Sequence, residues 1–423
     1  MPVDGPAHPH TGRHGHNVGM SCRPPFTASP RPTAAAALPE PLAWIDVGLE
    51  ALRRDGLERP RRVRAGRQGR VVELDGRALL NFGSNDYLGL AGDVRLTKAA
   101  SRAACAEGFG SGASPLVSGH SSTHAALEAA LAQLLDTGDA LLFPSGFAAN
   151  AATIAAIVGP GDIIFSDERN HASIIDGCRL SRAAVAVFPH RDVAALDRLL
   201  AATPARRRLI ITDSLFSMDG TIAPLADLAA VASRHAAILM VDEAHATGVF
   251  GARGSGLVEA SDTADGVHVR VGTLSKALGS AGGFVAGHPR LVDWLRHSAR
   301  AWVFSTAHPP AVAGAALRSV QLLAAEPQRR TTLLGKATAF RDRLRAAGLD
   351  LGAAAAQIVP VIVGSAAGAV ALAARLADEG LFVPAIRPPS VPAGGSLVRA
   401  SLACHHTNDD LDLLARALTG SRE

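Results

Sequence analysis

Lys276 is the residue whose type and surroundings most directly suggest chemistry. It lies in the stretch Val271-Gly-Thr-Leu-Ser-Lys-Ala-Leu-Gly279, and the small residues at 279–283 that follow predict a turn. It is the only lysine between Lys98 and Lys336, in a chain that takes nearly all its positive charge from arginine. A desolvated lysine can lose its proton and attack a carbonyl carbon, whereas arginine stays protonated. A solvated loop lysine is the plainer interpretation, so the choice depends on what the rest of the chain places nearby.

Polar side chains follow four short apolar runs that precede the Lys276 stretch. The runs at 140–143, 162–165, 209–212 and 238–241 lead into the polar segments 144–150, 166–173, 213–220 and 242–248. Such runs alternate with helical stretches from about 96 to 285, which predicts a mostly parallel sheet covered on both faces. Ligands bind outside the carboxyl ends of strands in open α/β sheets, so we expect one site at that edge.

A lysine can form a Schiff base with an aldehyde cofactor such as pyridoxal phosphate (PLP). Binding PLP requires four further groups from the protein. Asp242 is placed to pair with a protonated pyridine nitrogen, and residues 145–150 could offer backbone N–H groups to a phosphate at a helix start. His171 could stack on the ring, and His245 could bond to its hydroxyl. Each residue has a plain structural explanation, since a strand-end Asp often caps a helix and a lone His is usually a structural residue with satisfied hydrogen bonds. Their order along one α/β segment favours the joint interpretation.

Seven short motifs occur in order along the chain. They are Asn85-Asp-Tyr-Leu-Gly-Leu90, Ser118-Gly119, Ser145-Gly-Phe-Ala-Ala-Asn150, Asn170-His-Ala-Ser173, Phe216-Ser-Met-Asp-Gly220, Val241-Asp-Glu-Ala-His245 and Thr273-Leu-Ser-Lys276. As a set they resemble the α-oxoamine synthases, PLP enzymes of fold type I, the aspartate-aminotransferase fold. The resemblance runs from about residue 42 to residue 418. It implies an α/β fold with a large, mostly parallel sheet domain and a smaller α+β C-terminal domain.

The resemblance also implies roles for individual residues. Lys276 would hold the cofactor and move the Cα proton, Asp242 would pair with the pyridinium, His171 would stack on the ring, and His245 would contact the hydroxyl region; these four form the catalytic set. Further cofactor contacts are implied for Gly146, Phe147, Ser217 and Thr273, and for Ser305 and Thr306, which would reach the cofactor of a neighbouring subunit in a homodimer. Substrate contacts are implied for Asn85, Arg399, Ser390 and Arg59, of which Arg399 would take the amino-acid carboxylate. Ser390 stands where the family pattern has Thr.

The activity implied is the decarboxylative condensation of an amino acid with an acyl thioester. The stretch Ile386-Arg-Pro-Pro-Ser-Val-Pro-Ala-Gly394 is most similar to those members that join L-alanine to a pimeloyl thioester, carried by coenzyme A or by acyl carrier protein. Members that use glycine or serine are an alternative. A non-catalytic partner subunit is a remote one, disfavoured because Lys276, Asp242 and His245 are all present.

Composition limits the other classes of function. The chain has 423 residues, 48% of them apolar, and a formal charge of +4. Residues 1–70 hold eleven arginines and six acidic residues, so the remainder is slightly acidic and does not favour a nucleic-acid role. No apolar run is long and unbroken enough for a membrane span. The four cysteines, Cys22, Cys105, Cys178 and Cys404, lack metal-ligand spacing and suit a reduced, cytoplasmic compartment.

The chain is predicted to divide into four parts. Residues 1–40 are interpreted as a disordered tail, 41–95 as an N-terminal helix and hairpin, 96–310 as the large PLP-binding domain, and 311–423 as the small domain. The tail histidines at 8, 10, 14 and 16 have no acidic or Cys partner and are not taken as a metal site. The arginine-rich stretch 59–70 is either a solvated loop or a collar for an anionic substrate or an acidic carrier protein. No metal is expected.

Overall fold

The structure is a computed structural model that describes residues 38–420. The predicted tail and its histidines lie outside the described residues, except for positions 38–40. The described chain divides into two compact units, with the boundary along the sequence between Glu50 and Ala51. The first contains the 3-10 helix η1 (Glu40–Leu42) and the start of helix α1 (Trp44–Arg54), and α1 lies within residues 41–95, where a helix was predicted. No helix within residues 38–420 is long and apolar enough to cross a membrane.

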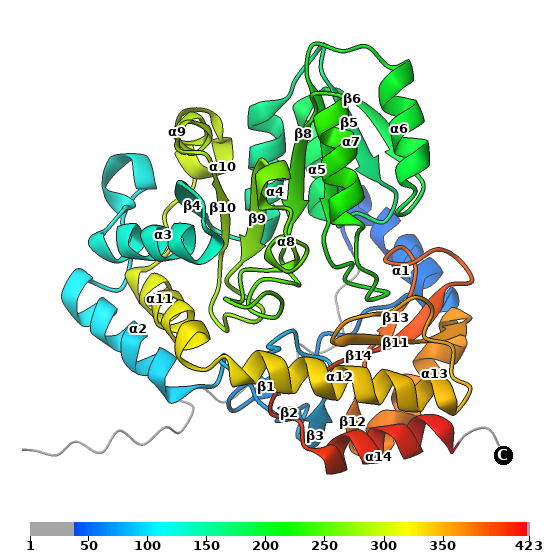
Figure 1. The fold of residues 1–423 in the computed structure, drawn as a ribbon. Coiled ribbons are helices and arrows are strands. Elements are labelled where there is room, and N and C mark those ends of the chain that lie inside the picture. The colour runs from blue at the N-terminus through cyan, green and yellow to red at the C-terminus, as the bar shows by residue number, and fades with distance from the viewer. Residues whose placement is uncertain (1–37, 421–423) are drawn as a thin grey trace, which may run out of the picture. The chain divides into compact units, whose positions relative to one another are not determined.

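A seven-stranded sheet forms the centre of the second unit (Figure 1). Its strands, in spatial order, are β4 (Asp139–Phe143), β10 (Gly283–Gly287), β9 (Val269–Thr273), β8 (Ile238–Asp242), β7 (Arg208–Asp213), β5 (Ile163–Asp167) and β6 (Ala184–Phe188). Strands β9, β8, β7, β5 and β6 pair in parallel, and β10 runs antiparallel to both β4 and β9. The predicted fold class, a mostly parallel sheet, is confirmed.

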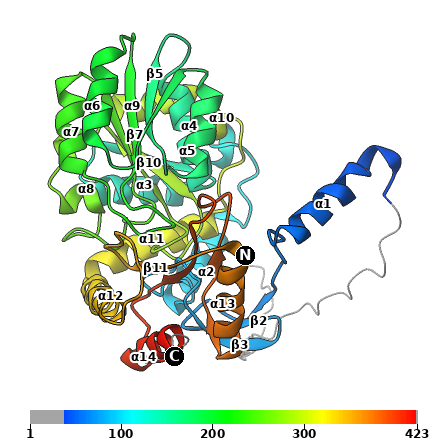
Figure 2. The ribbon, with the colours of Figure 1, turned by 90° about the vertical axis from the view of Figure 1, so that its right-hand side faces the viewer.

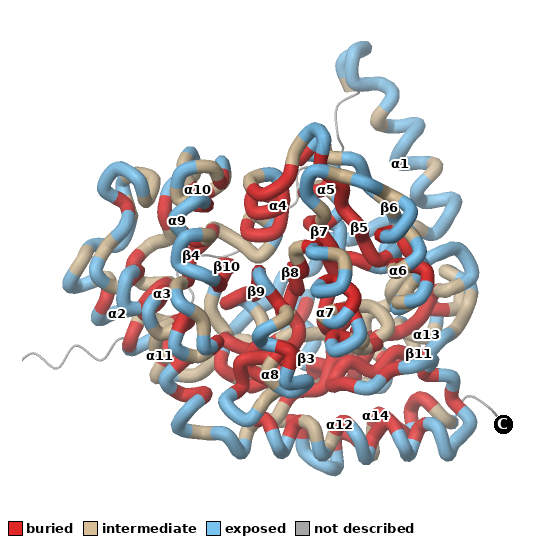
Figure 3. Tube along the Cα trace, turned by 45° about the horizontal axis from the view of Figure 1, so that its top comes forward, coloured by how far each residue is buried: buried red, intermediate tan, exposed pale blue. Residues whose placement is uncertain are grey.

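Helices cover both faces of this sheet, because alternate residues of a strand point to opposite faces. Leu209 and Ile211 of β7 pack in one core cluster with helices α4 (Gly146–Ile157), α5 (Ala172–Ser181) and α9 (Pro289–Ser298). Ile210, between them, packs in the other cluster with α6 (Val193–Ala202) and α7 (Leu225–Arg234). Figure 2 shows α6 and α7 on one side of β5 and β7, with α4 and α5 on the other. In Figure 3 the strands β7 and β8 and the helix α4 are drawn mainly as buried.

Two smaller sheets complete the second unit. One has the order β1 (Arg64–Ala65), β2 (Val71–Leu74), β3 (Arg77–Asn81), β12 (Leu381–Phe382), and the other β11 (Ile358–Gly364), β14 (Ser396–Ser401), β13 (Ala385–Ile386). The β2–β3 hairpin lies within residues 41–95, where a hairpin was predicted, and turns through Asp75 and Gly76 at φ angles of 50° and 80°. Because β12 pairs in parallel with β3, a segment from early in the chain and one from late share a sheet.

The remaining helices are as follows: α2 (Val94–Glu107), the π-helical turn η2 (Pro115–Gly119), α3 (Ser122–Leu135), α8 (Leu257–Ala260), the 3-10 turn η3 (Ala264–Gly266), α10 (Arg300–Val303), α11 (Pro310–Ala325), α12 (Gln328–Ala346), α13 (Ala366–Asp378) and α14 (Asn408–Thr419). Helices α12, α13 and α14 lie within residues 311–423, the part predicted to be the small domain. The domain boundaries at 95 and 310 stay predictions.

Candidate active site

Lys276 lies in the turn between β9 and β10. The Gly279 N–H donates to the Lys276 carbonyl at 2.9 Å, and Leu274 N–H donates to the Gly282 carbonyl at 2.9 Å, which closes the turn across its base. The expected turn thus ends at Gly282 rather than Gly283, because Gly283 already pairs with Thr273 in β10. No residue within 38–420 makes a hydrogen bond or ion pair with the Lys276 amine. That amine is thus available to a ligand.

The protonation of Lys276 is set by its surroundings. Burial disfavours the ammonium form and lowers the pKa of Lys276 to about 8, from an ordinary value of 10.5. Asp242 and Asp213 oppose this shift by stabilising the positive charge, whereas Arg399 adds to it. The lysine remains partly accessible to solvent, so a ligand can reach it.

A chain of hydrogen bonds joins Asp242 to His171. Asn150 uses one amide hydrogen to donate to Asp242 Oδ2 at 2.6 Å and the other to donate to Ser173 Oγ at 2.9 Å. Ser173 Oγ lies 2.7 Å from His171 Nδ1, and the Ser173 N–H also donates to Nδ1 at 3.2 Å. Nδ1 is therefore an acceptor, which puts the proton of a neutral His171 on Nε2. Burial lowers the pKa of His171, with Asp242 opposing and Lys276 adding, and this supports the neutral ring.

Asp213 is a second carboxylate beside Asp242. The two residues are partners in register at the ends of the parallel strands β7 and β8. Asp213 Oδ2 accepts the backbone N–H of His171 at 2.8 Å. Burial is the main cause that raises the pKa of Asp213 well above its ordinary value, and the negative charge of Asp242 adds to it. Two neighbouring carboxyls in this setting do not both ionise readily, which explains the direction of this shift.

His245 belongs to a second hydrogen-bonded chain. Its Nδ1 lies 2.6 Å from the hydroxyl of the fully buried Tyr87, and that hydroxyl donates to Asn85 Oδ1 at 3.2 Å. Arg399 Nη2 donates to the same Asn85 oxygen at 2.8 Å. Burial raises the pKa of Tyr87 to about 12 and lowers that of His245 well below its ordinary value, so both side chains are neutral. The arrangement holds the buried guanidinium of Arg399 against Asn85 and Tyr87.

The start of helix α4 forms a set of free donors. Ser145 caps the helix by accepting the Ala148 N–H at 3.0 Å, while the N–H groups of Gly146 and Phe147 have no acceptor within the described chain. Thr273 lies beside this helix start, because a Cβ built on Gly146 would be 3.4 Å from the Thr273 Cβ. The N-terminus of a helix carries partial positive charge and favours a phosphate.

These groups fit PLP on chemical grounds. An unpartnered amine, a carboxylate held by Asn150, a neutral imidazole and two free N–H groups at a helix start are what its aldehyde, pyridine nitrogen, ring face and phosphate require. All belong to the carboxyl ends of β4, β5, β8 and β9, the edge at which the sequence predicted a site. Within the described residues no cluster suited to a metal ion occurs.

Other predicted site residues are not joined to this group. Ser217 lies in the loop after β7, with no hydrogen bond from its side chain to the residues above. Ser305 and Thr306 follow α10, beside a small cavity of about 20 Å³ that Phe143 and Pro144 also line. Arg59 and Ser390 line a separate cavity of about 170 Å³ with Arg387. The roles assigned to all predicted site residues stay predictions.

Sequence reasoning gave some residues a different part or none. Asn150 was placed in the phosphate cradle, whereas its side chain holds Asp242 and Ser173. Tyr87 is the only tyrosine of the chain, which is a usable signal, but the sequence alone gives it no role. Asp213 carried no signal beyond its place at a strand end.

The chain matches a known protein family and is similar to curated proteins over most of its length. Residues 77–418 match the model of the family described as aminotransferase class I and II, and the chain belongs to this family. A curated relative, the 8-amino-7-oxononanoate synthase of Anaeromyxobacter sp. (strain Fw109-5), is 53% identical over 378 residues, which cover 89% of this chain and 95% of the relative. A second, from Anaeromyxobacter dehalogenans (strain 2CP-1 / ATCC BAA-258), is 49% identical over 377 residues, with the same two coverages.

Solved structures agree with this placement. A serine palmitoyltransferase from S. paucimobilis, described with bound PLP and myriocin, is 30% identical, covers 90% of this chain and 97% of its own, and has a TM-score of 0.85. The 8-amino-7-oxononanoate synthase of Francisella tularensis is 27% identical, covers 81% and 97%, and has a TM-score of 0.70. The predicted resemblance to α-oxoamine synthases, the type I fold and the PLP dependence are confirmed.

Proposed function

We propose that this protein condenses L-alanine with a pimeloyl thioester to give 8-amino-7-oxononanoate, carbon dioxide and a free thiol, a step of biotin biosynthesis. The observation that carries the proposal is the near-full-length similarity to curated 8-amino-7-oxononanoate synthases. The reaction forms one carbon–carbon bond and breaks the thioester and the bond to the alanine carboxylate.

The cofactor would be held by the strand-end groups. PLP, when bound, supplies a pyridinium ring that accepts electrons from the Cα of the amino acid. Lys276 would bind its aldehyde carbon, and Asp242 would pair with its ring nitrogen. The backbone N–H groups of Gly146 and Phe147 and the nearby Thr273 would hold the phosphate. Ser217 and His245 would contact the hydroxyl region, and the His171 ring would cover one face.

Lys276 would also move the proton at the alanine Cα. With its pKa lowered to about 8, roughly one amine in ten is neutral at pH 7, compared with fewer than about one in a thousand at an ordinary lysine pKa. A base whose pKa lies near the working pH transfers protons most efficiently. Arg399 would bind the alanine carboxylate through Nη1, which has no partner in residues 38–420, while Asn85 holds Nη2.

The acyl group would enter from the arginine-rich side. Arg59, Ser390 and Arg387 line one cavity, and Arg59, Arg62 and Arg387 line a neighbouring one of about 380 Å³. The guanidinium groups suit the free carboxylate of a pimeloyl chain or the phosphates of its carrier. Coenzyme A and acyl carrier protein both satisfy this chemistry, so either could deliver the substrate.

The active form would be a homodimer. Leu116, Val117 and Phe304 are 58%, 77% and 70% exposed, and they flank Pro115, Ser305 and Thr306, which line the same small cavity. Large apolar side chains exposed together favour a protein partner. A second copy of the chain would cover them and bring Ser305 and Thr306 to its own cofactor site.

A serine- or glycine-using reaction is the second candidate, because the serine palmitoyltransferase structure superposes with the higher TM-score. The test is to supply pimeloyl-CoA with L-alanine, glycine or L-serine in parallel and to identify the aminoketone by mass spectrometry. We expect 8-amino-7-oxononanoate from L-alanine, with turnover at least about ten-fold above the other two. Preferred turnover of glycine or serine would overturn the proposal in favour of the second candidate.

A further inference from the structure

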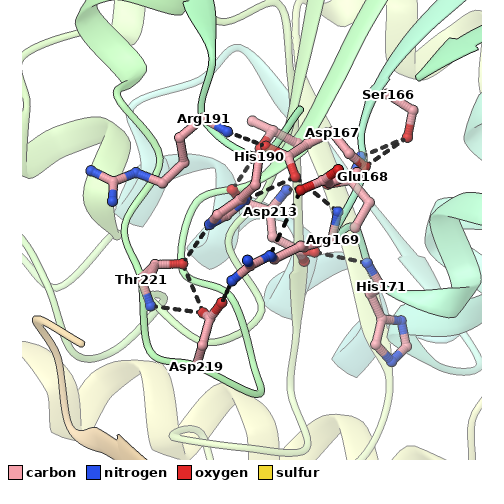
Figure 4. A network of polar contacts seen from close by, with 12 residues as sticks. Ser166, Asp167, Glu168, Arg169, His171, His190, Arg191, Asp213, Asp219 and Thr221 are labelled. Carbon is pink, nitrogen blue, oxygen red and sulfur yellow. Dashed lines mark hydrogen bonds and ion pairs between the residues drawn. The ribbon is translucent and has the colours of Figure 1, made fainter. Parts of the chain in front are cut away.

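A closed network of polar side chains joins the loops that follow three neighbouring strands (Figure 4). Asp167 ends β5, His190 follows the end of β6, and Thr221 belongs to the loop after β7. His190 Nδ1 lies 3.0 Å from Asp167 Oδ1, and His190 Nε2 lies 2.9 Å from Thr221 Oγ1. Asp167 and Thr221 are only 3% exposed, so these contacts are largely shielded from water.

Thr221 also joins His190 to Asp219, because Thr221 Oγ1 lies 2.7 Å from Asp219 Oδ1. The one hydrogen of this hydroxyl goes either to Asp219 or to His190 Nε2, and the tautomer of His190 decides which. Asp219 Oδ2 accepts from Arg169 Nη1 at 2.6 Å, and the Arg169 N–H donates to Asp167 Oδ1 at 2.9 Å, which closes the ring. An Asp–His–Thr series resembles that of a hydrolase, but here the hydroxyl is buried and in contact with Asp219, so it is closed to a substrate.

The network ends at two residues of the proposed PLP site. Asn170 Oδ1 accepts the Asp213 N–H at 3.0 Å, and the next residue, His171, donates its N–H to Asp213 Oδ2 at 2.8 Å. The loop of Arg169 and Asn170 therefore positions His171. Figure 4 shows His171 at the edge of the network and Asp213 near its centre.

The other end of the network supports Ser217. Phe216, the residue before it, packs edge-on against the His190 ring at 4.4 Å, with the two planes at 90°. The Phe216 N–H donates to the Thr221 carbonyl at 2.9 Å, which makes the loop a small hairpin with Ser217 near its tip. His190 thus contacts both the loop that carries His171 and the loop that carries Ser217.

We propose that His190 is a positioning residue of the cofactor site, which sets His171 and Ser217 at a fixed separation through Asp167 and Thr221. The inference rests on the proposed PLP chemistry and adds a residue that neither the sequence patterns nor the proposed mechanism uses. Groups that orient the residues in contact with a ligand commonly matter almost as much as those residues themselves.

The test compares substitutions inside the network with a matched one outside it. His190→Leu removes both ring contacts and Thr221→Val removes only the hydroxyl, whereas Thr221→Ser keeps it. His235→Leu is the control, because His235 Nε2 makes a similar contact at 2.6 Å to Asp197, between α7 and α6. For each holoenzyme we would measure the PLP dissociation constant, the circular dichroism signal of bound PLP, and the melting temperature.

We expect His190→Leu and Thr221→Val each to raise the PLP dissociation constant by roughly ten-fold and to weaken the dichroism signal, with Thr221→Ser close to the unsubstituted protein. His235→Leu should lower the melting temperature and leave both PLP readouts unchanged. If Thr221→Val, the milder change, or His190→Leu lowered only the melting temperature, the positioning role would be wrong. These readouts do not depend on the product, so a protein that made a different aminoketone would still support the role if PLP binding responded as stated.

Discussion

At the scale of single residues, the chemistry depends on the Lys276 amine, which has no partner among residues 38–420. Burial and Arg399 favour the neutral form of Lys276, while Asp242 and Asp213 favour the protonated form. The balance lowers the pKa to about 8, so the amine is protonated below that pH and nucleophilic above it. An amine poised in this way can bond to an aldehyde and can also take up a proton near neutral pH.

The first prediction concerns the pH dependence of cofactor capture. When PLP is added to PLP-free protein, the rate of the absorbance change should rise with pH, with a midpoint near 8, because only the neutral amine attacks the aldehyde. Stopped-flow absorbance between about pH 6 and pH 10 measures this, and Lys276→Arg should show no such change. A midpoint near the ordinary lysine value of 10.5 would contradict the proposed environment.

The second prediction concerns Asn150, which holds Asp242. Asn150→Ala removes a buried donor to a carboxylate and should lower the free energy of unfolding of the holoenzyme by about 2 kcal/mol and weaken PLP binding. Thr153→Val, one turn further along α4, is the control, since the buried Thr153 hydroxyl already lacks a partner in the described chain. Denaturant unfolding and PLP titration should separate the two substitutions. Equal effects would mean that Asn150 acts only through packing.

The residue scale also shows what a sequence can indicate about a site. Lys276, Asp242, His171 and His245 stand out because each is a reactive type just past an apolar run, and runs of parallel strands end together. The part played by Asn150 depends on a side-chain bond from α4 to β8, over a separation of 92 residues, and no local pattern contains such information. Arg59 and Ser390 meet at one cavity only because the late segment folds back on the early one.

At the scale of elements, the turn between β9 and β10 presents Lys276. Gly279 has a φ angle of 61°, and a Cβ there would lie 2.5 Å from the Ala91 nitrogen. The β9–β10 turn therefore packs closely against the segment that follows the Asn85–Leu90 motif. A bulkier residue would force either this backbone or the turn to move, and the amine with it.

The third prediction follows from that contact. Gly279→Ala should weaken PLP binding and destabilise the protein by more than Gly161→Ala, which has a φ angle of 86° but nothing within 4 Å of its Cβ. The control should cost about 1–2 kcal/mol from the strained φ alone. Thermal unfolding together with PLP titration measures both effects. If the two glycines behaved alike, the close approach to Ala91 would not control the turn.

Elements were predictable where their pattern was strong. The runs that became β4, β5, β7 and β8 are continuous and apolar, as expected for strands buried on both faces. Strand β6 is a short apolar run followed by His190, and the sequence analysis did not single it out; most of its residues are exposed. Strand β10 begins and ends with Gly, which favours a turn, and forms because its backbone pairs with β4 and β9. The two-residue strands β1, β12 and β13 are defined by their partners alone.

At the scale of the whole molecule, the fold and the choice of amino-acid substrate are inferred from different observations. The backbone superposes on a serine palmitoyltransferase with a TM-score of 0.85 and on an 8-amino-7-oxononanoate synthase with a TM-score of 0.70. The fold therefore supports the PLP chemistry without choosing the amino acid. That choice depends on the side chains around the substrate, where similarity to the curated 8-amino-7-oxononanoate synthases carries the inference.

The fourth prediction is that the protein is a homodimer in solution. Val117→Asp places a charge among Leu116, Phe304 and Thr306 and should shift the protein toward monomers with weaker PLP binding. Val187→Asp on β6, at the other edge of the sheet from β4 and 59% exposed, is the control and should change neither property. Light scattering after size exclusion gives the mass. A monomeric, fully active protein would contradict the proposed assembly.

The most direct test of the proposed site is to locate the covalently bound cofactor. Borohydride reduction of the holoenzyme fixes PLP to the lysine that carries it, and mass spectrometry of the resulting peptides identifies that residue. The chain offers only Lys98, Lys276 and Lys336. We predict one phosphopyridoxyl group per chain, on Lys276, and none after Lys276→Ala. Modification of Lys98 or Lys336 in place of Lys276, or a holoenzyme with no modified lysine, would contradict the account.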